Sequence, residues 1–303
     1  MKVVAMAGGT GSAKLLRGLS RLPVDLTVVA NVGDNFWAYG AYVCPDVDIA
    51  CYTLAGKADP RGWGLEGDTF EALGSFASLG LETWFRLGDR DLAVCMARTE
   101  MMRRGSSLTD ATDRIRRSLG VRCRVLPVTD QPVETRLETP LGDLHLQEFW
   151  VRERGRPAVR KVRYEGAARA KVAGGVKKAI EGADRVIICP ANPVTSVGPM
   201  TAVPGFIGLL SRTEARVVAL SPMVGRRPVS GPAGKLLRAT GVRPDSLGVA
   251  GAYSRFLDAL LVSERDAPLK SSVEELGVKC ALTDTLMRTP GDEARLAREL
   301  VEA

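Results

Sequence analysis

The chain begins with Lys2–Ser12, KVVAMAGGTGS, and this stretch carries the strongest indication of a fold. Lys2–Ala7 is a short apolar run with β-branched side chains, which predicts a buried strand, and Gly8–Ser12 interrupts it. A helical pattern follows at once over Ala13–Leu19. Strand, glycine turn and helix in this order open an α/β nucleotide-binding unit. Because the first N–H groups of a helix lack partners within it and carry partial positive charge, a phosphate fits this turn.

The glycine turn matches no standard phosphate-binding motif completely. The Gly-Lys-Ser/Thr ending of a Walker A loop is absent. After Gly9 and Gly11, the third position of the dinucleotide fingerprint is Lys14. Lys14 can instead meet a phosphate as a point charge. A tight turn without any ligand is the alternative interpretation.

The composition is that of a globular protein without membrane spans. The chain has 303 residues, 45% of them hydrophobic, which we interpret as one α/β domain over residues 1–303. No apolar run approaches the ~18–20 residues of a membrane helix. Met1 precedes the first predicted strand directly, so we expect no signal peptide and a cytoplasmic location.

The charge and the reactive side chains restrict the possible classes of ligand and site. The net charge is +7, but basic residues are dispersed and aromatic residues are few, so an anionic small molecule explains the charge without nucleic acid. The six cysteines form no C-x-x-C pair and are expected as buried free thiols. The only histidine, His145, has no nearby metal-ligand partner, and we expect an ordinary strand residue.

The remaining pattern predicts a doubly wound, mostly parallel sheet. Further strands are expected at Leu26–Asn31, Val121–Pro127, Arg185–Cys189, Arg216–Leu220 and Leu261–Val262, with helices at Leu92–Arg104, Ser107–Leu119, Ala168–Glu181, Tyr253–Leu260 and Asp292–Val301. Between approximately 129 and 166, alternating segments that include Leu144–Arg152 predict a small antiparallel insertion.

Acidic residues gather after the second predicted strand. Asp34, Asp46 and Asp48 are expected in loops at the carboxyl end of that strand, and Asp59 follows soon after. Carboxylates beside a phosphate-binding turn are typical of a Mg²⁺ site. The alternative is that they cap helices or stabilise turns. For Asp68 we favour a cap on the helix that follows it.

Trp84–Leu92, WFRLGDRDL, places four charges directly after two aromatic residues. This mixture suits a pocket that stacks a ring and holds anionic groups. The alternative is a surface salt-bridge network, with Asp91 capping the next helix.

Two further loops, Pro190–Pro199 and Ser221–Lys235, follow predicted strands at their carboxyl ends. We expect both to border the same crevice as Gly8–Ser12, where open α/β sheets bind ligands. Ordinary connecting loops are the alternative. No Ser-His-Asp triad or Cys-His pair is present.

Six short motifs occur together in order along the chain. They are Gly8–Gly11 (GGTG), Asn31–Asp34 (NVGD) with Trp37, Pro45–Asp48 (PDVD), Leu87–Asp91 (LGDRD), Asn192-Pro193 with Ser196–Pro199 (SVGP), and Ser230–Lys235 (SGPAGK). Ser107–Asp110 and Glu264–Asp266 belong to the same pattern. With these motifs the chain, nearly end to end, resembles the 2-phospho-L-lactate transferase family of the CofD/FbiA type.

The resemblance implies a Rossmann-like core with a smaller subdomain, and a homodimer. It also implies a Mg²⁺-dependent reaction in the biosynthesis of coenzyme F-420. A phospholactyl or phosphoenolpyruvyl group would move from a GDP-activated donor to the terminal ribityl hydroxyl of the deazaflavin precursor Fo, releasing GMP.

The resemblance also assigns roles by position. Asp48 and Arg86 match the family's deazaflavin-binding positions, with Trp84 beside them; Arg86 stands where at least one family member has lysine. The residues expected on the nucleotide and phosphate side are Gly9, Thr10, Gly11, Lys14, Asn192, Ser196, Gly198, Ser230, Gly231 and Gly234. The Mg²⁺ ligands are expected among Asp34, Asp46, Asp48 and Asp59, and the catalytic carboxylates are Asp46 and Asp48.

Two other functions remain open from the sequence. An NAD-type oxidoreductase would use Gly9–Gly11 as a dinucleotide turn and Asp34 as the ribose acid, but Lys14 replaces the third glycine. A nucleotide-sensing regulator on the same fold would not need a deazaflavin pocket, so Trp84 and Arg86 favour the enzyme.

Overall fold

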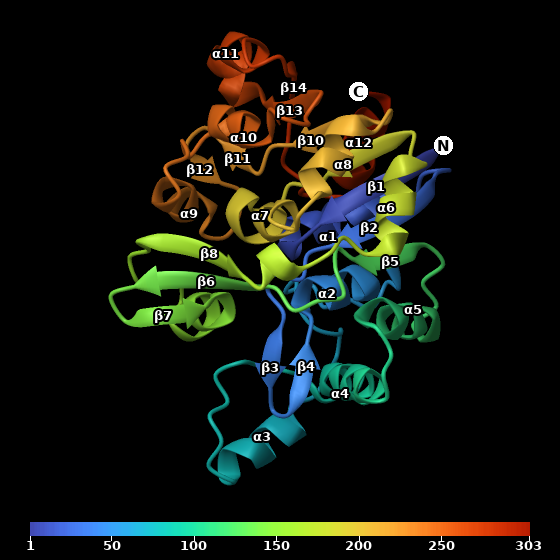
Figure 1. Cartoon of the computed structure of the whole chain (residues 1–303), viewed down its shortest axis with the longest axis vertical. Helices are drawn as coiled ribbons and strands as arrows, with labels where there is room; N and C mark the ends of the chain where they lie inside the picture. The colour runs from blue at the N-terminus through green and yellow to red at the C-terminus, as the bar shows by residue number, and fades with distance from the viewer.

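The computed structural model describes residues 1–303, and its centre is a seven-stranded parallel sheet (Figure 1). The strands are β1 (Lys2–Ala7), β2 (Asp25–Ala30), β5 (Arg124–Pro127), β9 (Arg185–Ile188), β10 (Arg216–Leu220), β13 (Ala259–Ser263) and β14 (Lys279–Thr283). Their order is β14-β13-β10-β9-β1-β2-β5. This confirms the predicted doubly wound α/β fold.

The strand order reverses between β1 and β9. The chain runs from β1 outward through β2 and β5, and then returns to β9 beside β1. Residues Val3–Met6 of β1 pair in parallel with Arg185–Ile188 of β9. At such a switch point the loops after the two central strands diverge, which leaves room for a ligand at the carboxyl edge.

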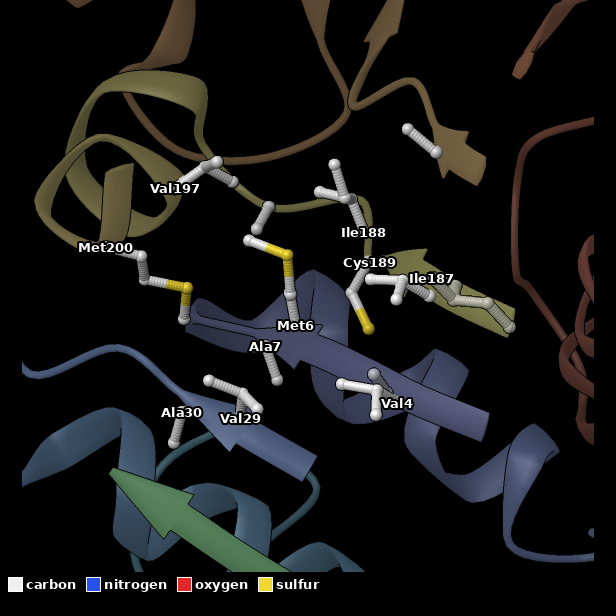
Figure 2. Packing of buried hydrophobic residues seen from close by; sticks show 14 of the residues in the cluster. Val4, Met6, Ala7, Val29, Ala30, Ile187, Ile188, Cys189, Val197 and Met200 are labelled. Carbon is white, nitrogen blue, oxygen red and sulfur yellow. The ribbon is translucent and has the colours of Figure 1, made fainter. Parts of the chain in front are cut away.

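The core lies around these central strands. Five of the six residues of β1 and of β2 are buried, as expected for parallel strands covered on both faces. Figure 2 shows Met6 of β1 and Ile188 of β9 in one buried cluster with Met200. The six cysteines are free and five of them are buried, as predicted.

Helices flank the sheet. They are α1 (Gly9–Leu19), α2 (Pro45–Leu54), α3 (Glu71–Ser78), α4 (Asp89–Arg103), α5 (Leu108–Ser118), α6 (Gly174–Glu181), α7 (Gly198–Thr201), α8 (Phe206–Arg212), α9 (Ala233–Ala239), α10 (Ser246–Tyr253), α11 (Lys270–Glu274) and α12 (Pro290–Glu302). Ser107 caps α5 as predicted, since its hydroxyl accepts a bond from Asp110 N. No single helix is long and apolar enough to span a membrane; one pair with suitable length and composition, Pro193–Thr201 and Phe206–Arg212, is bent by 87°.

The predicted antiparallel insertion is present as β6 (Glu134–Thr139), β7 (Gly142–His145) and β8 (Lys161–Glu165), in the order β7-β6-β8. The predicted strand at 144–152 is wrong beyond His145, because Glu148–Arg152 forms a π-helical turn, η1. The Glu148 carboxylate accepts a hydrogen bond from His145 N at 2.7 Å, and His145 Nδ1 accepts one from Gln147 N. These local bonds end the strand.

Two short hairpins extend from the main sheet. β3 (Phe36–Ala38) pairs with β4 (Ala41–Val43) and projects away from the main sheet with α3 (Figure 1). β11 (Met223–Val224) pairs with β12 (Arg227–Pro228). Around β3 and β4 a second apolar cluster forms, which includes Phe36, Leu87 and Leu92.

Several predicted boundaries in the second half are wrong. The helix predicted at Tyr253–Leu260 is wrong. The helix in this region, α10, runs over Ser246–Tyr253 and is capped by the Asp245 carboxylate, which accepts a hydrogen bond from Gly248 N. The segment after Tyr253 leads into β13, and β14 was not predicted. The predicted loop Pro190–Pro199 is largely helical: Pro193–Val197 forms a π-helical turn, η3, and α7 follows.

Candidate active site

The glycine turn after β1 and the segment after β9 are in direct contact. A Cβ atom placed on Gly8 would lie 2.5 Å from Ser196 Cβ, and one on Gly11 would lie 2.5 Å from the Pro190 carbonyl oxygen. Only glycine fits at either position. The structure therefore brings the predicted phosphate turn together with Ser196 at the switch point.

The first helix begins inside the glycine run. α1 starts at Gly9, which has a φ of +72°, a value that favours glycine. Gly9 N donates a hydrogen bond of 2.6 Å to Asp46 Oδ1. The N–H groups of Thr10 and Gly11 follow in the first turn, where a helix offers donors without partners inside it. A carboxylate and the predicted diphosphate site thus share one helix N-terminus.

Asp46 and Asp48 are not in a loop, and this part of the prediction is wrong. Both lie in the first turn of α2, which begins at Pro45, a residue suited to the first helical position. Both are buried. Their side chains have different partners: Asp46 faces Gly9, whereas Asp48 faces Arg98.

Asn31 connects two of the predicted carboxylates. Its Nδ2 donates to Asp34 Oδ1 at 2.9 Å, to Asp46 Oδ2 at 2.8 Å and to Thr195 O at 3.1 Å. Its Oδ1 accepts from Gly33 N at 2.9 Å. Asn31 is completely buried, and its two amide hydrogens face three acceptors. It belonged to a quoted motif but was not predicted as a site residue; its position at the end of β2 was the available signal.

The Asp34–Asp46 pair carries concentrated negative charge. Burial raises the pKa of Asp46, and burial together with the negative charge of Asp46 raises the pKa of Asp34 well above its usual range. Gln147 Nε2 is 3.4 Å from Asp34 Oδ2. Two adjacent carboxylates beside the predicted phosphate-binding turn are a donor set that suits Mg²⁺, whose charge offsets their repulsion.

Asp48 belongs to a separate buried cluster. Its carboxylate accepts from Arg98, which is fully buried, and from Cys95 Sγ at 3.9 Å. Burial raises the pKa of Asp48, although Arg98 opposes this. Burial and the charge of Asp48 raise the pKa of Asp91 to about 7; Asp91 also accepts a bond of 2.6 Å from Tyr52 Oη. The potential ligand atoms of Asp48, Asp91 and Cys95 lie within 4.8 Å of one another, but the Arg98 cation already neutralises Asp48 and disfavours a metal there.

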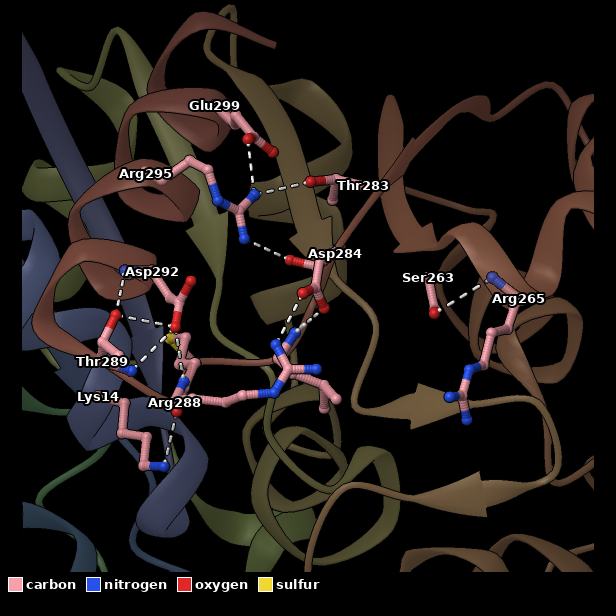
Figure 3. Close-up of polar contacts among 12 residues, drawn as sticks. Lys14, Ser263, Arg265, Thr283, Asp284, Arg288, Thr289, Asp292, Arg295 and Glu299 are labelled. Carbon is pink, nitrogen blue, oxygen red and sulfur yellow. Dashed lines mark hydrogen bonds and ion pairs between the residues drawn. The ribbon is translucent and has the colours of Figure 1, made fainter.

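Two other predicted residues are engaged elsewhere. Asp59 pairs with Arg61, with Nε–Oδ1 and Nη2–Oδ2 distances of 2.7 and 2.8 Å, and this pairing lowers the Asp59 pKa. Lys14 Nζ donates to the Met287 carbonyl oxygen at 2.8 Å, on the side of α1 that faces the segment before α12 (Figure 3). The structure does not bring Asp59 or Lys14 into contact with the Asp34–Asp46 pair.

Trp84 and Arg86 each pack against the ring of an aromatic residue. The Trp84 ring is 6.0 Å from that of Phe36, and the Arg152 guanidinium lies 5.9 Å above it. Arg86 Cζ lies 4.6 Å above the Phe70 ring. Phe36 also stacks on His145, at 5.3 Å. His145 is a buried residue of β7, as predicted, and burial lowers its pKa to about 4.

Asp68 does not cap the helix that follows it, so that prediction is wrong. Its carboxylate accepts from Arg90 N and Asp91 N, both at 3.0 Å, at the start of α4. Asp89 in turn accepts from Glu71 N and Ala72 N at the start of α3. Asp68, which precedes α3, thus accepts hydrogen bonds from the N-terminal N–H groups of α4, and Asp89 of α4 accepts those near the start of α3. Such an exchange between two segments cannot be predicted from local sequence.

Two of the residues predicted on the nucleotide side, Asn192 and Gly198, have roles in the local structure. Asn192 Oδ1 accepts from Val194 N at 2.9 Å and caps η3. A Cβ on Gly198 would lie 2.0 Å from Tyr164 Oη, which donates to Val194 O at 2.6 Å. Gly198 therefore makes room for the insertion.

Downstream, Ser230 and Gly231 are exposed, and Gly234 is buried in α9. Lys235 Nζ donates to three carbonyl oxygens of the insertion, those of Gly155 at 2.6 Å, Arg156 at 3.1 Å and Pro157 at 3.2 Å. Through these bonds Lys235 joins the start of α9 to the insertion.

Comparison with known proteins gives a consistent relationship. Residues 3–289 match the family described as 2-phospho-L-lactate transferase CofD. The chain is 40% identical to the 2-phospho-L-lactate transferase of Methanosarcina mazei over 99% of this chain and 100% of that protein. It is 43% identical to the enzyme of that name from Methanopyrus kandleri, over 99% and 97%. It is 38% identical to a phosphoenolpyruvate transferase of Streptomyces griseus, over 100% and 98%.

The fold has a solved counterpart. A member of the UPF0052 family from Bacillus halodurans superposes with a TM-score of 0.66, covering 99% of this chain and 100% of that one at 18% identity. At that identity the likeness concerns the fold alone. From the match over nearly the whole chain and the full-length relatives, we conclude that this chain belongs to the 2-phospho-L-lactate transferase family and is a transferase.

Proposed function

We propose that the chain transfers a phospholactyl or phosphoenolpyruvyl group from a GDP-activated donor to the deazaflavin precursor Fo, with release of GMP, in coenzyme F-420 biosynthesis. The names of its relatives, 2-phospho-L-lactate transferase and phosphoenolpyruvate transferase, support this identity of the transferred group. The single structural observation that carries the proposal is the Asp34–Asp46 pair beside the helix N-terminus at Gly9. That arrangement suits a diphosphate and a divalent cation together.

The protein's residues would bind and orient the donor. The N–H groups of Thr10 and Gly11 lie in the first turn of α1, where the helix dipole would stabilise a diphosphate. Asp34 and Asp46 would hold Mg²⁺, which when bound neutralises charge on the diphosphate. Asn31 keeps the two carboxylates side by side. Positioning and charge neutralisation of this kind dominate phosphoryl-type transfer.

The transfer itself exchanges one P–O bond for another. The acceptor's terminal hydroxyl oxygen attacks the phosphorus that bears the lactyl or enolpyruvyl group, and the bond from that phosphorus to the GMP oxygen breaks. The hydroxyl proton passes to a carboxylate. We assign this role to Asp46 rather than Asp48, because Asp46 lies at the glycine turn and accepts only neutral donors, whereas the charge of Asp48 is neutralised by the buried Arg98 cation. Asp48 then orients the start of α2.

The resemblance assigns the acceptor side to Asp48, Arg86 and Trp84. Arg86 packs on Phe70, and Trp84 packs on Phe36. Both residues belong to the segment between β2 and β5, on the β2 side of the switch point. With Asp48 directed to Arg98, we propose that Arg86 and Trp84 contact the acceptor. The family resemblance is also the basis for proposing a homodimer.

A mass-spectrometric assay tests the proposal. Purified protein receives Fo and Mg²⁺ with, in separate reactions, the guanylylated phospholactate or phosphoenolpyruvate donor. We expect the phosphorylated Fo adduct and GMP in at least one reaction, which also identifies the donor. No product in either reaction, with GMP still bound, would favour a nucleotide-sensing protein on this fold.

A further inference from the structure

A small hairpin rests on the phosphate-binding turn. Ala58 and Leu65 form an antiparallel bridge, and Gly62 N donates to Asp59 O at 2.9 Å. At the tip, Gly62 has a φ of +90°, and a Cβ placed on it would lie 3.0 Å from Thr10 Cγ2. The hairpin therefore brings its side chains to the edge of the turn that would hold the diphosphate.

This hairpin begins a row of alternating cations and aromatic rings. Arg61 Cζ lies 4.4 Å above the Trp63 ring, and the Trp63 and Phe70 ring centroids are 6.3 Å apart. Arg86 Cζ lies 4.6 Å above the other end of the row, at Phe70. We call Arg61, Trp63, Phe70 and Arg86 the cation–aromatic wall. It connects the phosphate turn with the segment that contains Trp84.

The wall is not part of the hydrophobic core. Trp63 is 37% exposed, and neither Trp63 nor Phe70 belongs to the two buried apolar clusters. Trp63 is nevertheless held in place, because Asp59 pairs with Arg61 through two hydrogen bonds and Arg61 covers the indole. An oriented, exposed indole next to cations offers a flat surface on which a planar ring can stack.

The position of the wall indicates which ring it meets. The wall comes from segments that follow β2, on one side of the switch point. The segments expected to hold the nucleoside, 190–198 and 230–234, follow β9 and β10 on the other side. A substrate ring that stacks on Trp63 therefore belongs to the acceptor rather than to the guanosine of the donor.

We propose that Trp63, oriented by Arg61, stacks on the planar ring of the acceptor and determines specificity for it. This rests on the proposed function and adds a residue to its acceptor site. The ring would lie along the wall, and the chain that carries the attacking hydroxyl would extend past Gly62 toward Thr10. Trp63 acts in binding and takes no part in bond making.

Steady-state kinetics of Trp63→Leu and Trp63→Phe test the inference. We expect Trp63→Leu to raise the KM for Fo by about five- to tenfold, with donor KM and kcat changed less than about twofold, because stacking contributes to binding alone. Trp63→Phe should keep a KM for Fo close to the wild-type value, because a phenyl ring can still stack. The matched control is Trp37→Leu, since Trp37 is 62% exposed but packs on Tyr42 outside the wall.

Tryptophan fluorescence separates the possible ligands. We expect Fo to quench emission of the wild-type protein, GMP alone to leave it unchanged, and Trp63→Phe to lose a large part of the Fo-dependent quenching, with the remainder coming from Trp84. Quenching by GMP instead, or an unchanged KM for Fo in Trp63→Leu, would overturn the assignment of Trp63 while leaving the transfer reaction intact. Absence of turnover and of Fo binding in the wild type would overturn the proposed function, and this inference with it.

Discussion

Asn31 is the residue on which the geometry of the site depends. One buried amide group holds Asp34, Asp46 and the Thr195 carbonyl, and so joins the segments after β2 and β9 to the start of α2. No periodicity in the sequence distinguishes it from any other residue at a strand end. The carboxylates could be predicted from their residue type, but the amide that pairs them depends on contacts between distant segments.

The Asp34–Asp46 pair costs stability in the absence of a cation. The folded-state pKa of Asp34 is raised, so its ionised form is disfavoured by folding at neutral pH. We predict that Asp34→Asn increases the free energy of unfolding at pH 7 without Mg²⁺ by about 1–2 kcal/mol and abolishes turnover. Urea denaturation and the product assay measure the two effects. A variant less stable than the wild type would contradict this account of the pair.

The raised pKa of Asp91 predicts that the stability of the protein depends on pH. Its folded-state pKa is about 7, above the ordinary aspartate value, so its contribution to stability is lost as pH rises toward 7. Asp48 and Asp68 favour its protonated form, whereas Arg98 and the Tyr52 hydroxyl oppose them. We predict that the stability advantage of Asp91→Asn over the wild type grows by about 2–3 kcal/mol between pH 5 and pH 8, because the loss begins above the unfolded-state pKa of about 4 and is complete above the folded-state pKa.

Urea denaturation at both pH values measures this difference. Asp25→Asn is a suitable control, because Asp25 is an exposed residue at the start of β2. An Asp91→Asn variant whose advantage is the same at pH 5 and pH 8 would show that Asp91 does not titrate in this range.

At the scale of elements, Arg98 holds three segments together. From α4 it donates to Asp48 of α2 and to the Tyr42 carbonyl of β4, and it is completely buried. We predict that Arg98→Met lowers the free energy of unfolding by about 3–5 kcal/mol, because Asp48 is left buried and unpaired. The double variant Arg98→Met with Asp48→Asn should recover part of that loss. Equal losses in the single and double variants, measured by urea denaturation, would contradict the ion-pair explanation.

The elements themselves were predicted unevenly, for physical reasons. β1, β10 and the capped start of α5 follow from local apolar pattern and cap chemistry, and the structure confirms them. Asp68 and Asp89 exchange helix caps across about twenty residues, and Pro193–Val197 turns helical among buried neighbours. Such features depend on tertiary contacts, which a local pattern does not contain.

At the scale of the whole molecule, the insertion lies across the switch point. Tyr164 bonds to Val194 O, Gln147 approaches Asp34, and Lys235 bonds to the insertion's carbonyl groups. These contacts link the two halves of the sheet. The insertion's strands were predicted from their alternation, but its contacts with the site were not.

Lys235 tests how firmly the insertion is held. We predict that Lys235→Met lowers the free energy of unfolding by about 1–2 kcal/mol and speeds proteolytic cleavage near Gly155, because three carbonyl groups lose their donor. Lys177→Met is the control, since Lys177 is exposed and its ammonium lies only near Glu181. If both variants are cleaved at the wild-type rate, the contact does not restrain the insertion.

A kinetic comparison shows whether Asp34 and Asp46 form the reactive pair that holds the metal. It is the Mg²⁺ dependence of product formation from Fo and the guanylylated donor, compared between Asp46→Asn and Asp59→Asn. We predict that Asp46→Asn loses at least about a hundredfold in kcat at any Mg²⁺ concentration. Asp59→Asn should keep the wild-type Mg²⁺ requirement and raise only the KM for Fo, because Asp59 bonds to Arg61. Retained activity in Asp46→Asn, with a lost Mg²⁺ response in Asp59→Asn, would show that Asp59 rather than Asp46 holds the metal.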